Sequence, residues 1–348
     1  MKKIFFILFL VSTKIIFAQS YDTIQRKSIL LTNATIHIGN GTVYENGVIG
    51  FDKGKIILIG DATTIKYDQT KFSEIINCTG KHIYPGLIAL NTQLGLKEIE
   101  LVRASNDISE LGEMNPNVRS VISYNTDSKV IPTIRTNGIL TAQIVPQGGV
   151  ISGTSSVVQL DAWNWEDAAL KTDEGMHVNW PAYYAYSFDG GVFQITVNKN
   201  YTESVNKLKI FFDEANAYCK INSAVNKNLK FEAMRNLFNG KTKLFIHANS
   251  AKEIISAIQF AAQYNLTPII VGASEAYKVL DILKEKYISV ILEDIHTLPS
   301  STDADIKMPY KLPSILQNAG IEYAISLSFS HWNMRNLPFT AGTAVANG

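Results

Sequence analysis

The sequence has few cysteines, no excess of one charge and, beyond its first 20 residues, no long apolar run. Its two cysteines, Cys78 and Cys219, lie too far apart for a metal-binding spacing or a disulfide framework. The 32 basic and 31 acidic residues leave a net charge of +1, which argues against a nucleic-acid partner. A hydrophobic content of 46% over 348 residues is typical of a globular protein with one large and one smaller domain.

The N-terminus has the pattern of a secretory signal. Lys2 and Lys3 precede the apolar run 4–11, and a small residue, Ala18, stands where cleavage would occur. A membrane anchor is the alternative, but the run has only eight residues and Lys14 separates it from the next apolar residues, so it is too short to span a bilayer. We therefore predict a signal peptide over residues 1–18 and a periplasmic or secreted protein that has no membrane contact after cleavage.

The rest of the chain changes its pattern near residue 86. Short β-type runs with tight turns fill residues 28–85, including a hairpin turn at Asp52–Gly54. Beyond them, apolar strands alternate with amphipathic helices, which predicts a parallel sheet. The expected strands are 138–146, 242–249, 266–274, 288–294 and 321–328. We predict an α/β fold, a (β/α)8 TIM-like barrel over 86–348, preceded by a small N-terminal β-sandwich module over 19–85.

Residues 150–200 are expected to be irregular and to build the active-site face of the barrel. The stretch 148–156 is rich in glycine and hydroxyl side chains, so Gly149 and Ser152 are candidates for binding a substrate carbonyl or carboxylate, with a simple tight turn as the alternative. Aromatic residues of this region could form a wall for a ligand, although such residues also fill cores: Trp163, Trp165, Trp180, Tyr183, Tyr184 and Tyr186.

Several separate motifs carry a family resemblance. They are GKHIYPGLIALN (80–91), RTNGILTAQIVPQGGVISG (135–153), LFIHANSAKEI (244–254) and RNLPFTAGTAVANG (335–348). In this order they resemble the amidohydrolase superfamily, and more closely the imidazolonepropionase-like, secreted bacterial amidohydrolases. The resemblance implies hydrolysis of C–N bonds other than peptide bonds. It also implies one or two divalent metals bound by a His-x-His pair on the first barrel strand and by later histidines, with an aspartate on the eighth strand.

The sequence departs from this pattern at the metal positions. Asn91 and Gln93 occupy the places of the two first-strand histidines, and amides are weak ligands for zinc, so both are candidates for substrate contact only. The eighth-strand aspartate is missing near Leu327. His247 matches the fifth-strand ligand and is a candidate metal ligand or catalytic base, or a histidine that is hydrogen-bonded inside the barrel mouth. We expect one divalent metal, zinc if any, or none.

Other histidines come after strand ends. His331 comes soon after the last strand and could replace the lost catalytic base, although we expect a surface loop there. His296 comes just after Glu293 and Asp294 and could bind metal with them, although a loop cap is the favoured interpretation. His177 is expected in the aromatic insertion.

Two functions remain open on the sequence alone. The first is an exported amidohydrolase-like hydrolase of cyclic amides, amides or dipeptide-like substrates with an altered or reduced metal site. The second is a catalytically inactive relative that binds a small molecule or serves as a structural partner of an active paralogue, in either case with a possible homo-oligomer. The sequence stops inside what is expected to be the last barrel helix, and we expect a further segment that completes the β module.

Overall fold

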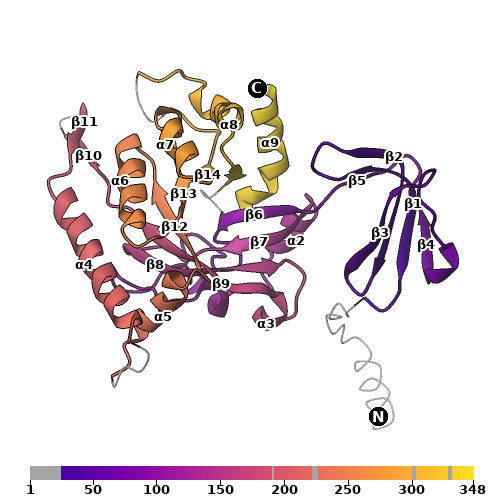
Figure 1. Ribbon diagram of the computed structural model, residues 1–348, viewed down its shortest axis with the longest axis horizontal. Coiled ribbons are helices and arrows are strands. Elements are labelled where there is room, and N and C mark those ends of the chain that lie inside the picture. Colours follow the sequence, from indigo (N-terminus) through magenta and orange to yellow (C-terminus); the bar gives the residue numbers. More distant parts are fainter. Residues whose placement is uncertain (1–24, 190–191, 222–225, 300–302, 328–330) are drawn as a thin grey trace, which may run out of the picture. The chain divides into compact units, whose positions relative to one another are not determined.

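The computed structural model describes residues 25–189, 192–221, 226–299, 303–327 and 331–348 (Figure 1). The segment predicted to be a signal peptide lies outside these ranges. The chain divides into two compact units, which meet in sequence between Pro85 and Gly86. None of the helices in the described ranges combines the length and the hydrophobicity that crossing a bilayer requires.

The first unit is a five-stranded sheet. Its strands are β1 (Ile29–His37), β2 (Val43–Asp52), β3 (Lys55–Asp61), β4 (Glu74–Asn77) and β5 (His82–Ile83). They run in the order β3-β2-β1-β4, and β5 pairs with another part of β1. The predicted hairpin turn is confirmed between β2 and β3, where Lys53 and Gly54 both have positive φ. Every second residue of β1 from Leu30 to Ile36 is buried, as a strand with one covered face requires.

The second unit is built on an eight-stranded sheet that curves into a nearly closed barrel, which confirms the predicted fold class (Figure 1). The strands, in spatial order, are β6 (Leu87–Thr92), β7 (Ile139–Ile144), β8 (Ile151–Gln159), β9 (Ala169–Asn179), β12 (Lys243–Ala248), β13 (Pro268–Gly272), β14 (Val290–Glu293) and β15 (Tyr323–Ser326). The hydroxyl of Ser326 donates to the carbonyl of Leu90 at 2.5 Å and so bridges the last and first strands.

One barrel strand breaks the predicted parallel pattern. β8 runs antiparallel to both β7 and β9, whereas the other neighbouring pairs are parallel. The expected irregular structure of residues 150–200 is therefore wrong for most of this stretch, which also holds the hairpin of β10 (Tyr184–Asp189) and β11 (Val192–Val197). β8 lacks an alternating pattern because both of its faces are buried. Its small residues allow close approach, since a Cβ on Gly153 would lie 2.5 Å from the Val118 carbonyl oxygen.

Helices alternate with most of the barrel strands along the chain. They are α2 (Val130–Arg135), α3 (Trp165–Ala168), α4 (Tyr201–Cys219), α5 (Leu229–Phe238), α6 (Ala251–Ala262), α7 (Leu280–Glu285), α8 (Met308–Ala319) and α9 (Leu337–Ala346). α6 packs on β12 and β13, and α8 packs on β15. Ser250 and Glu253 form a capping box, which places the start of α6 directly after β12. α8 ends at Gly320 in a left-handed conformation.

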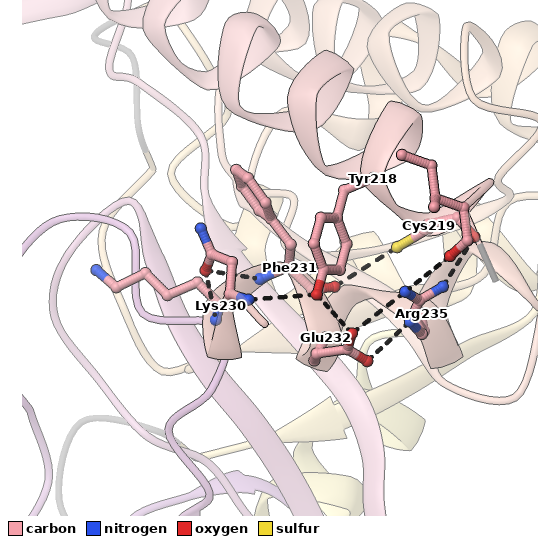
Figure 2. A network of polar contacts seen from close by, with 8 residues as sticks. Tyr218, Cys219, Lys230, Phe231, Glu232 and Arg235 are labelled. Atoms are coloured by element: carbon pink, nitrogen blue, oxygen red, sulfur yellow. Dashed lines mark hydrogen bonds and ion pairs between the residues drawn. The ribbon is translucent and has the colours of Figure 1, made fainter. Parts of the chain in front are cut away.

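A polar network joins α4 to α5 (Figure 2). Glu232 accepts hydrogen bonds from the Tyr218 hydroxyl at 2.6 Å and from Nε of Arg235 at 2.8 Å. Arg235 also donates to the Cys219 carbonyl at 2.9 Å, and thus satisfies a backbone acceptor at the C-terminal end of α4. The hydrogen bonds from Arg235 and Tyr218 lower the pKa of Glu232 to about 2. These contacts fix the helix pair that covers the outside of the barrel.

Candidate functional site

Two adjoining cavities open where barrel strands end. The larger has a volume of about 930 Å³ and lies at the carboxyl ends of β12 and β13, where His247, Asn249 and Ser274 line it. The smaller, of about 300 Å³, lies at the carboxyl end of β14 beside Glu293 and shares Asn249 and Ser274 with the first. The carboxyl end of the strands is where (β/α)8 barrels carry their functional groups. We call the larger cavity the mouth pocket.

His247 is the titratable side chain at the end of β12. Its side chain is half-buried and lines the mouth pocket, and its Nε2 lies 3.0 Å from Nδ1 of His177. Burial lowers the pKa of His247 to about 4, so the imidazole is neutral at pH 7. The predicted position of His247 in the barrel mouth therefore agrees with the structure, and its neighbour there is a second histidine.

His177 lies on barrel strand β9, so its expected place in an aromatic insertion is wrong. It is fully buried, stacks on the ring of Phe245 at a centroid distance of 4.7 Å, and its Nε2 lies 2.9 Å from the Ser155 hydroxyl. Burial, with a smaller contribution from His247, lowers its pKa well below the ordinary value. A sequence signal existed, because Met176 and Val178 flank His177 with apolar side chains as in a buried strand.

Polar contacts continue from Ser155 across the barrel. The Ser155 hydroxyl donates to Oε1 of Glu174 at 2.8 Å, and Nε2 of Gln143 donates to the same oxygen at 2.6 Å. Oε1 of Gln143 in turn accepts from the backbone N–H of Asn91 at 3.0 Å. Strands β6, β7, β8, β9 and β12 thus contribute to one series of buried polar groups. We call this series the buried polar chain: Asn91, Gln143, Glu174, Ser155, His177 and His247.

The close packing of this chain depends on Gly175. A Cβ at this position would lie 2.3 Å from the ring of Phe245 and 2.8 Å from the Ser155 hydroxyl. Because Gly175 has no side chain, Phe245 can stack on His177 and Ser155 can reach Glu174.

Asn91 is a structural amide rather than an exposed substrate contact. Its side chain is 1% exposed, and its Nδ2 donates to Oε1 of Glu293 at the end of β14. Its backbone is left-handed, with φ of 49°, a conformation that asparagine tolerates better than most residues. Its Oδ1 is buried and makes no hydrogen bond to any residue in the described ranges. Gln93, the other amide of the motif, is half-buried just beyond the strand.

The backbone is also unusual at two neighbouring strand ends. Ala273, after β13, has φ of 51°, and Asp294, after β14, has φ of 39°. Left-handed non-glycine residues cost free energy, and such residues concentrate at functional sites. The ends of β6, β13 and β14 thus share a strained conformation around the two cavities.

The residues of the mouth do not fit the metal centre that the resemblance implies. The first-strand positions hold amides, and the amide nitrogen of Asn91 faces a carboxylate. Nε2 of His247 is engaged by His177, and the eighth-strand end holds Ser326, whose hydroxyl bonds the Leu90 carbonyl. Within the part of the chain that the structure describes, no three His, Cys, Asp or Glu side chains form a group that could hold a metal ion. The donor set is wrong in both chemistry and grouping for zinc.

The other two candidate histidines, His296 and His331, are not members of the buried polar chain. His296 is exposed, and its Nε2 lies 3.0 Å from the Thr343 hydroxyl on α9, as expected for a residue that ties down a loop. The expected surface position of His331 is wrong, because it is 2% exposed in a 3-10 helix, His331–Asn336. Burial and the nearby charge of Lys97 lower its pKa. Its sequence neighbours gave no apolar periodicity that would have indicated burial.

Gly149 and Ser152 hold a loop together. Nδ2 of Asn179, the last residue of β9, donates to the Gly149 carbonyl at 2.8 Å and to the Ser152 hydroxyl at 3.0 Å. A Cβ on Gly149 would lie 2.8 Å from the Glu113 carbonyl oxygen, so this position requires glycine. These contacts hold the turn before β8, whereas residues 151–156 of this stretch belong to the strand itself. By contrast, Trp180 and Tyr184 do line the mouth pocket, as an aromatic wall would.

Comparison with known proteins identifies solved structures that share this architecture. No family model and no curated protein matches the sequence. Among solved structures, an amidohydrolase from Thermotoga maritima matches with a TM-score of 0.76 and 20% sequence identity, over 92% of this chain and 84% of that one. A molinate hydrolase matches with a TM-score of 0.50 and 11% identity, over 92% of this chain and 81% of that one. The chain therefore has the amidohydrolase fold, and the resemblance seen in its sequence is confirmed at the level of the fold.

Proposed function

We propose that this chain hydrolyses a C–N bond other than a peptide bond, in a cyclic amide, an amide or a dipeptide-like substrate, and that His247 is its general base. The observation that carries the proposal is the neutral imidazole of His247 in the mouth pocket. A neutral imidazole can accept a proton, which an imidazolium cannot. The shared fold with an amidohydrolase supports the reaction class.

The reaction balances with water as the only co-reactant. His247 takes one proton from the attacking water while the water oxygen forms a bond to the carbonyl carbon. The imidazolium then returns that proton to the nitrogen as the C–N bond breaks, leaving a carboxyl group and an amine. Asn249 and Ser274 also line the pocket and carry donors that can bind the carbonyl oxygen as it gains charge. No step requires a metal, in keeping with the donor set of the mouth.

The size of the pocket supports a small-molecule substrate. Its volume of about 930 Å³ lies within the range of cavities that bind small ligands. Tyr184 and Ile195, from the hairpin β10–β11, give the pocket an apolar side, whereas Glu275 and Lys278 form an ion pair at 2.6 Å on its polar side. We propose in addition that the protein acts outside the cytoplasm, on the basis of its N-terminal sequence.

Hydrolysis of a panel of cyclic amides and dipeptides tests the proposal. The protein is freed of metal with a chelator and assayed beside His247→Gln and His37→Gln. General-base catalysis is worth about 10² to 10⁴ in rate, so we expect His247→Gln to lose about 100-fold or more in kcat/KM. His37 bonds His82 in the first unit, and its variant should retain the wild-type rate. Equal rates for wild type and His247→Gln would contradict the role of this histidine.

A second function is favoured by Asn91. Its amide occupies a metal-ligand position of the resembled family and is held there by Glu293, which suits a non-catalytic relative that binds a small molecule or pairs with an active paralogue. If wild type binds compounds of the panel by calorimetry but hydrolyses none of them, this second function replaces the first. Binding that is lost on mutation of Tyr184 would place the ligand in the mouth pocket.

A further inference from the structure

We propose that Glu174, acting through Ser155 and His177, fixes His247 in the tautomer whose Nδ1 is unprotonated, so that the mouth pocket is offered a proton acceptor. The proposal deepens the proposed function, because it concerns the state of the same imidazole. It makes Glu174, Ser155 and His177 positioning residues. It rests on the protons that each member of the buried polar chain can donate.

One end of the chain is fixed by a backbone group. The N–H of Asn91 can only donate, so the atom of Gln143 at 3.0 Å from it must be the amide oxygen. The amide nitrogen of Gln143 then faces Oε1 of Glu174 at 2.6 Å, where a carboxylate oxygen accepts. The orientation of the Gln143 amide is therefore determined by its two partners.

Ser155 has one proton and three neighbours that could receive it. Oε1 of Glu174 lies at 2.8 Å, the carbonyl oxygen of Gly175 at 3.3 Å, and Nε2 of His177 at 2.9 Å. If the proton pointed to His177, the hydroxyl oxygen would face the carboxylate oxygen at 2.8 Å with lone pairs on both atoms. The proton therefore goes to Glu174, and the hydroxyl oxygen accepts from His177.

The direction of the Ser155 hydroxyl proton determines which ring nitrogen carries the proton in each of the two histidines. His177 is fully buried and neutral, so it carries one ring proton, which lies on Nε2 and points to Ser155. Its Nδ1 is then an acceptor, and the hydrogen bond of 3.0 Å to His247 requires the proton on Nε2 of His247. His247 is also neutral, so its Nδ1 has a lone pair. Among the described residues, this Nδ1 has no hydrogen-bond partner.

The lone pair on Nδ1 of His247 limits which ligand groups suit the mouth pocket. His247 lines the pocket and its Nε2 is engaged by His177, so Nδ1 is the ring nitrogen left for a ligand, and the groups that suit it are donors: water, the N–H of an amide or a hydroxyl group. A ligand that presents only a carbonyl or carboxylate oxygen at this point would face a second lone pair. The buried polar chain thus selects a water molecule or an N–H or O–H donor for the position next to Nδ1.

Nitrogen NMR of the imidazole groups tests the proposal without any substrate. The shifts of Nδ1 and Nε2 differ strongly between protonated and unprotonated nitrogens, and the six histidines of the sequence can be assigned by single substitutions. In the wild type at pH 7 we expect His247 to be the Nε2–H form. In Ser155→Ala, His177 loses the acceptor for its Nε2 proton, so we expect its proton to move to Nδ1 and the Nδ1–H form of His247 to become the major one.

Two further variants separate this effect from a general disturbance of β8. Ser156, the next residue, accepts from the backbone N–H of Asp173 at 3.0 Å, and Ser156→Ala should leave the tautomer of His247 unchanged. Ser155→Thr keeps the hydroxyl and should also retain the wild-type form. A wild-type His247 in the Nδ1–H form would overturn the proposal, as would an unchanged tautomer in folded Ser155→Ala. Because no substrate is involved, failure of the hydrolysis assay would leave this result intact.

Discussion

At the scale of single residues, the amide of Asn91 is part of the hydrogen bonding inside the barrel. Its position at the end of β6 is that of a metal ligand in the resembled family, yet its nitrogen donates to Glu293 and its backbone N–H donates to Gln143. The residue thus serves the buried hydrogen bonding of the barrel, and its left-handed backbone adds a second reason for asparagine.

Replacement of Asn91 separates these two contributions. Asn91→Ala and Asn91→Gly both remove the hydrogen bond to Glu293, which should lower the free energy of unfolding by about 1–3 kcal/mol. Alanine also bears the cost of the positive φ, so its variant should be less stable than the glycine variant by about 1 kcal/mol. Urea denaturation of wild type, Asn91→Ala and Asn91→Gly measures the loss of the hydrogen bond and the additional cost of alanine. An alanine variant as stable as wild type would contradict the role of the amide.

The neutral state of His247 predicts a pH dependence of stability. Its pKa is about 4 in the folded protein, against an ordinary value of 6.5 in the unfolded chain, so the unfolded chain binds more protons between these pH values. The contribution of His247 to the free energy of unfolding is therefore fully present above pH 6.5 and is lost as the pH falls towards 4. At about 1.4 kcal/mol per pKa unit, His247 alone accounts for a loss of about 3 kcal/mol by pH 4. His177 adds to the loss in the same direction.

Denaturation at a series of pH values checks this expectation. His247→Gln has no proton to gain at this position, so its stability should depend less steeply on pH between 4 and 6.5 than that of wild type. Other groups titrate in both proteins, and their contribution cancels in the comparison. Parallel pH curves for the two proteins would show that His247 is not held neutral by the fold.

At the scale of elements, the junction of β12 and α6 positions His247. The strand ends at Ala248, and α6 begins after Ser250, whose hydroxyl accepts from the backbone N–H of Glu253. The Glu253 carboxylate accepts in return from the backbone N–H groups of Asn249 and Ser250, and also from that of Tyr183 at 2.7 Å. One side chain therefore links the turn after His247 to the segment that leads into the hairpin β10–β11.

Loss of the cap should be measurable by denaturation. Ser250→Ala removes an N-cap and should cost about 1 kcal/mol of unfolding free energy. Glu253→Ala should cost more, because three backbone N–H groups lose their acceptor. Asn200 is a matched control, because it stands at the N-cap of α4 without a side-chain capping bond, so Asn200→Ala should change stability little. Equal costs for Asn200 and Ser250 would contradict the capping role.

The elements also show how far the sequence predicts the molecule. The strands β12 to β15 and the capped helix α6 could be predicted because each has its own apolar pattern and local start and stop signals. The direction of β8 could not, because pairing depends on neighbours that are distant in sequence. The same limit applies to the site. His247 was found from its strand end, whereas His177, Ser155 and Glu174 become its partners only through the register of β8, β9 and β12.

At the scale of the whole molecule, the second unit has the barrel of the amidohydrolase fold, and hydrogen-bonded polar side chains cross its interior. The buried polar chain links side chains across the barrel, from Asn91 on β6 to His247 on β12, and His247 lines the mouth pocket. Hydrogen bonds between buried polar groups offset the cost of removing them from water. The fold is thus that of the solved amidohydrolase structure, and the centre of this barrel is held by hydrogen bonds between its own side chains.

Metal analysis of the purified protein tests this central point most directly. Elemental analysis, combined with thermal unfolding in the presence of zinc or a chelator, should find less than stoichiometric metal and a Tm that neither addition raises or lowers. A ligand present at about 100 times its Kd would stabilise the folded state by about 2.7 kcal/mol, so specific binding would be visible as a higher Tm. One equivalent of zinc that survives dialysis, with a Tm that falls on chelation and a loss of both effects in His247→Gln, would contradict a barrel mouth held by its own hydrogen bonds.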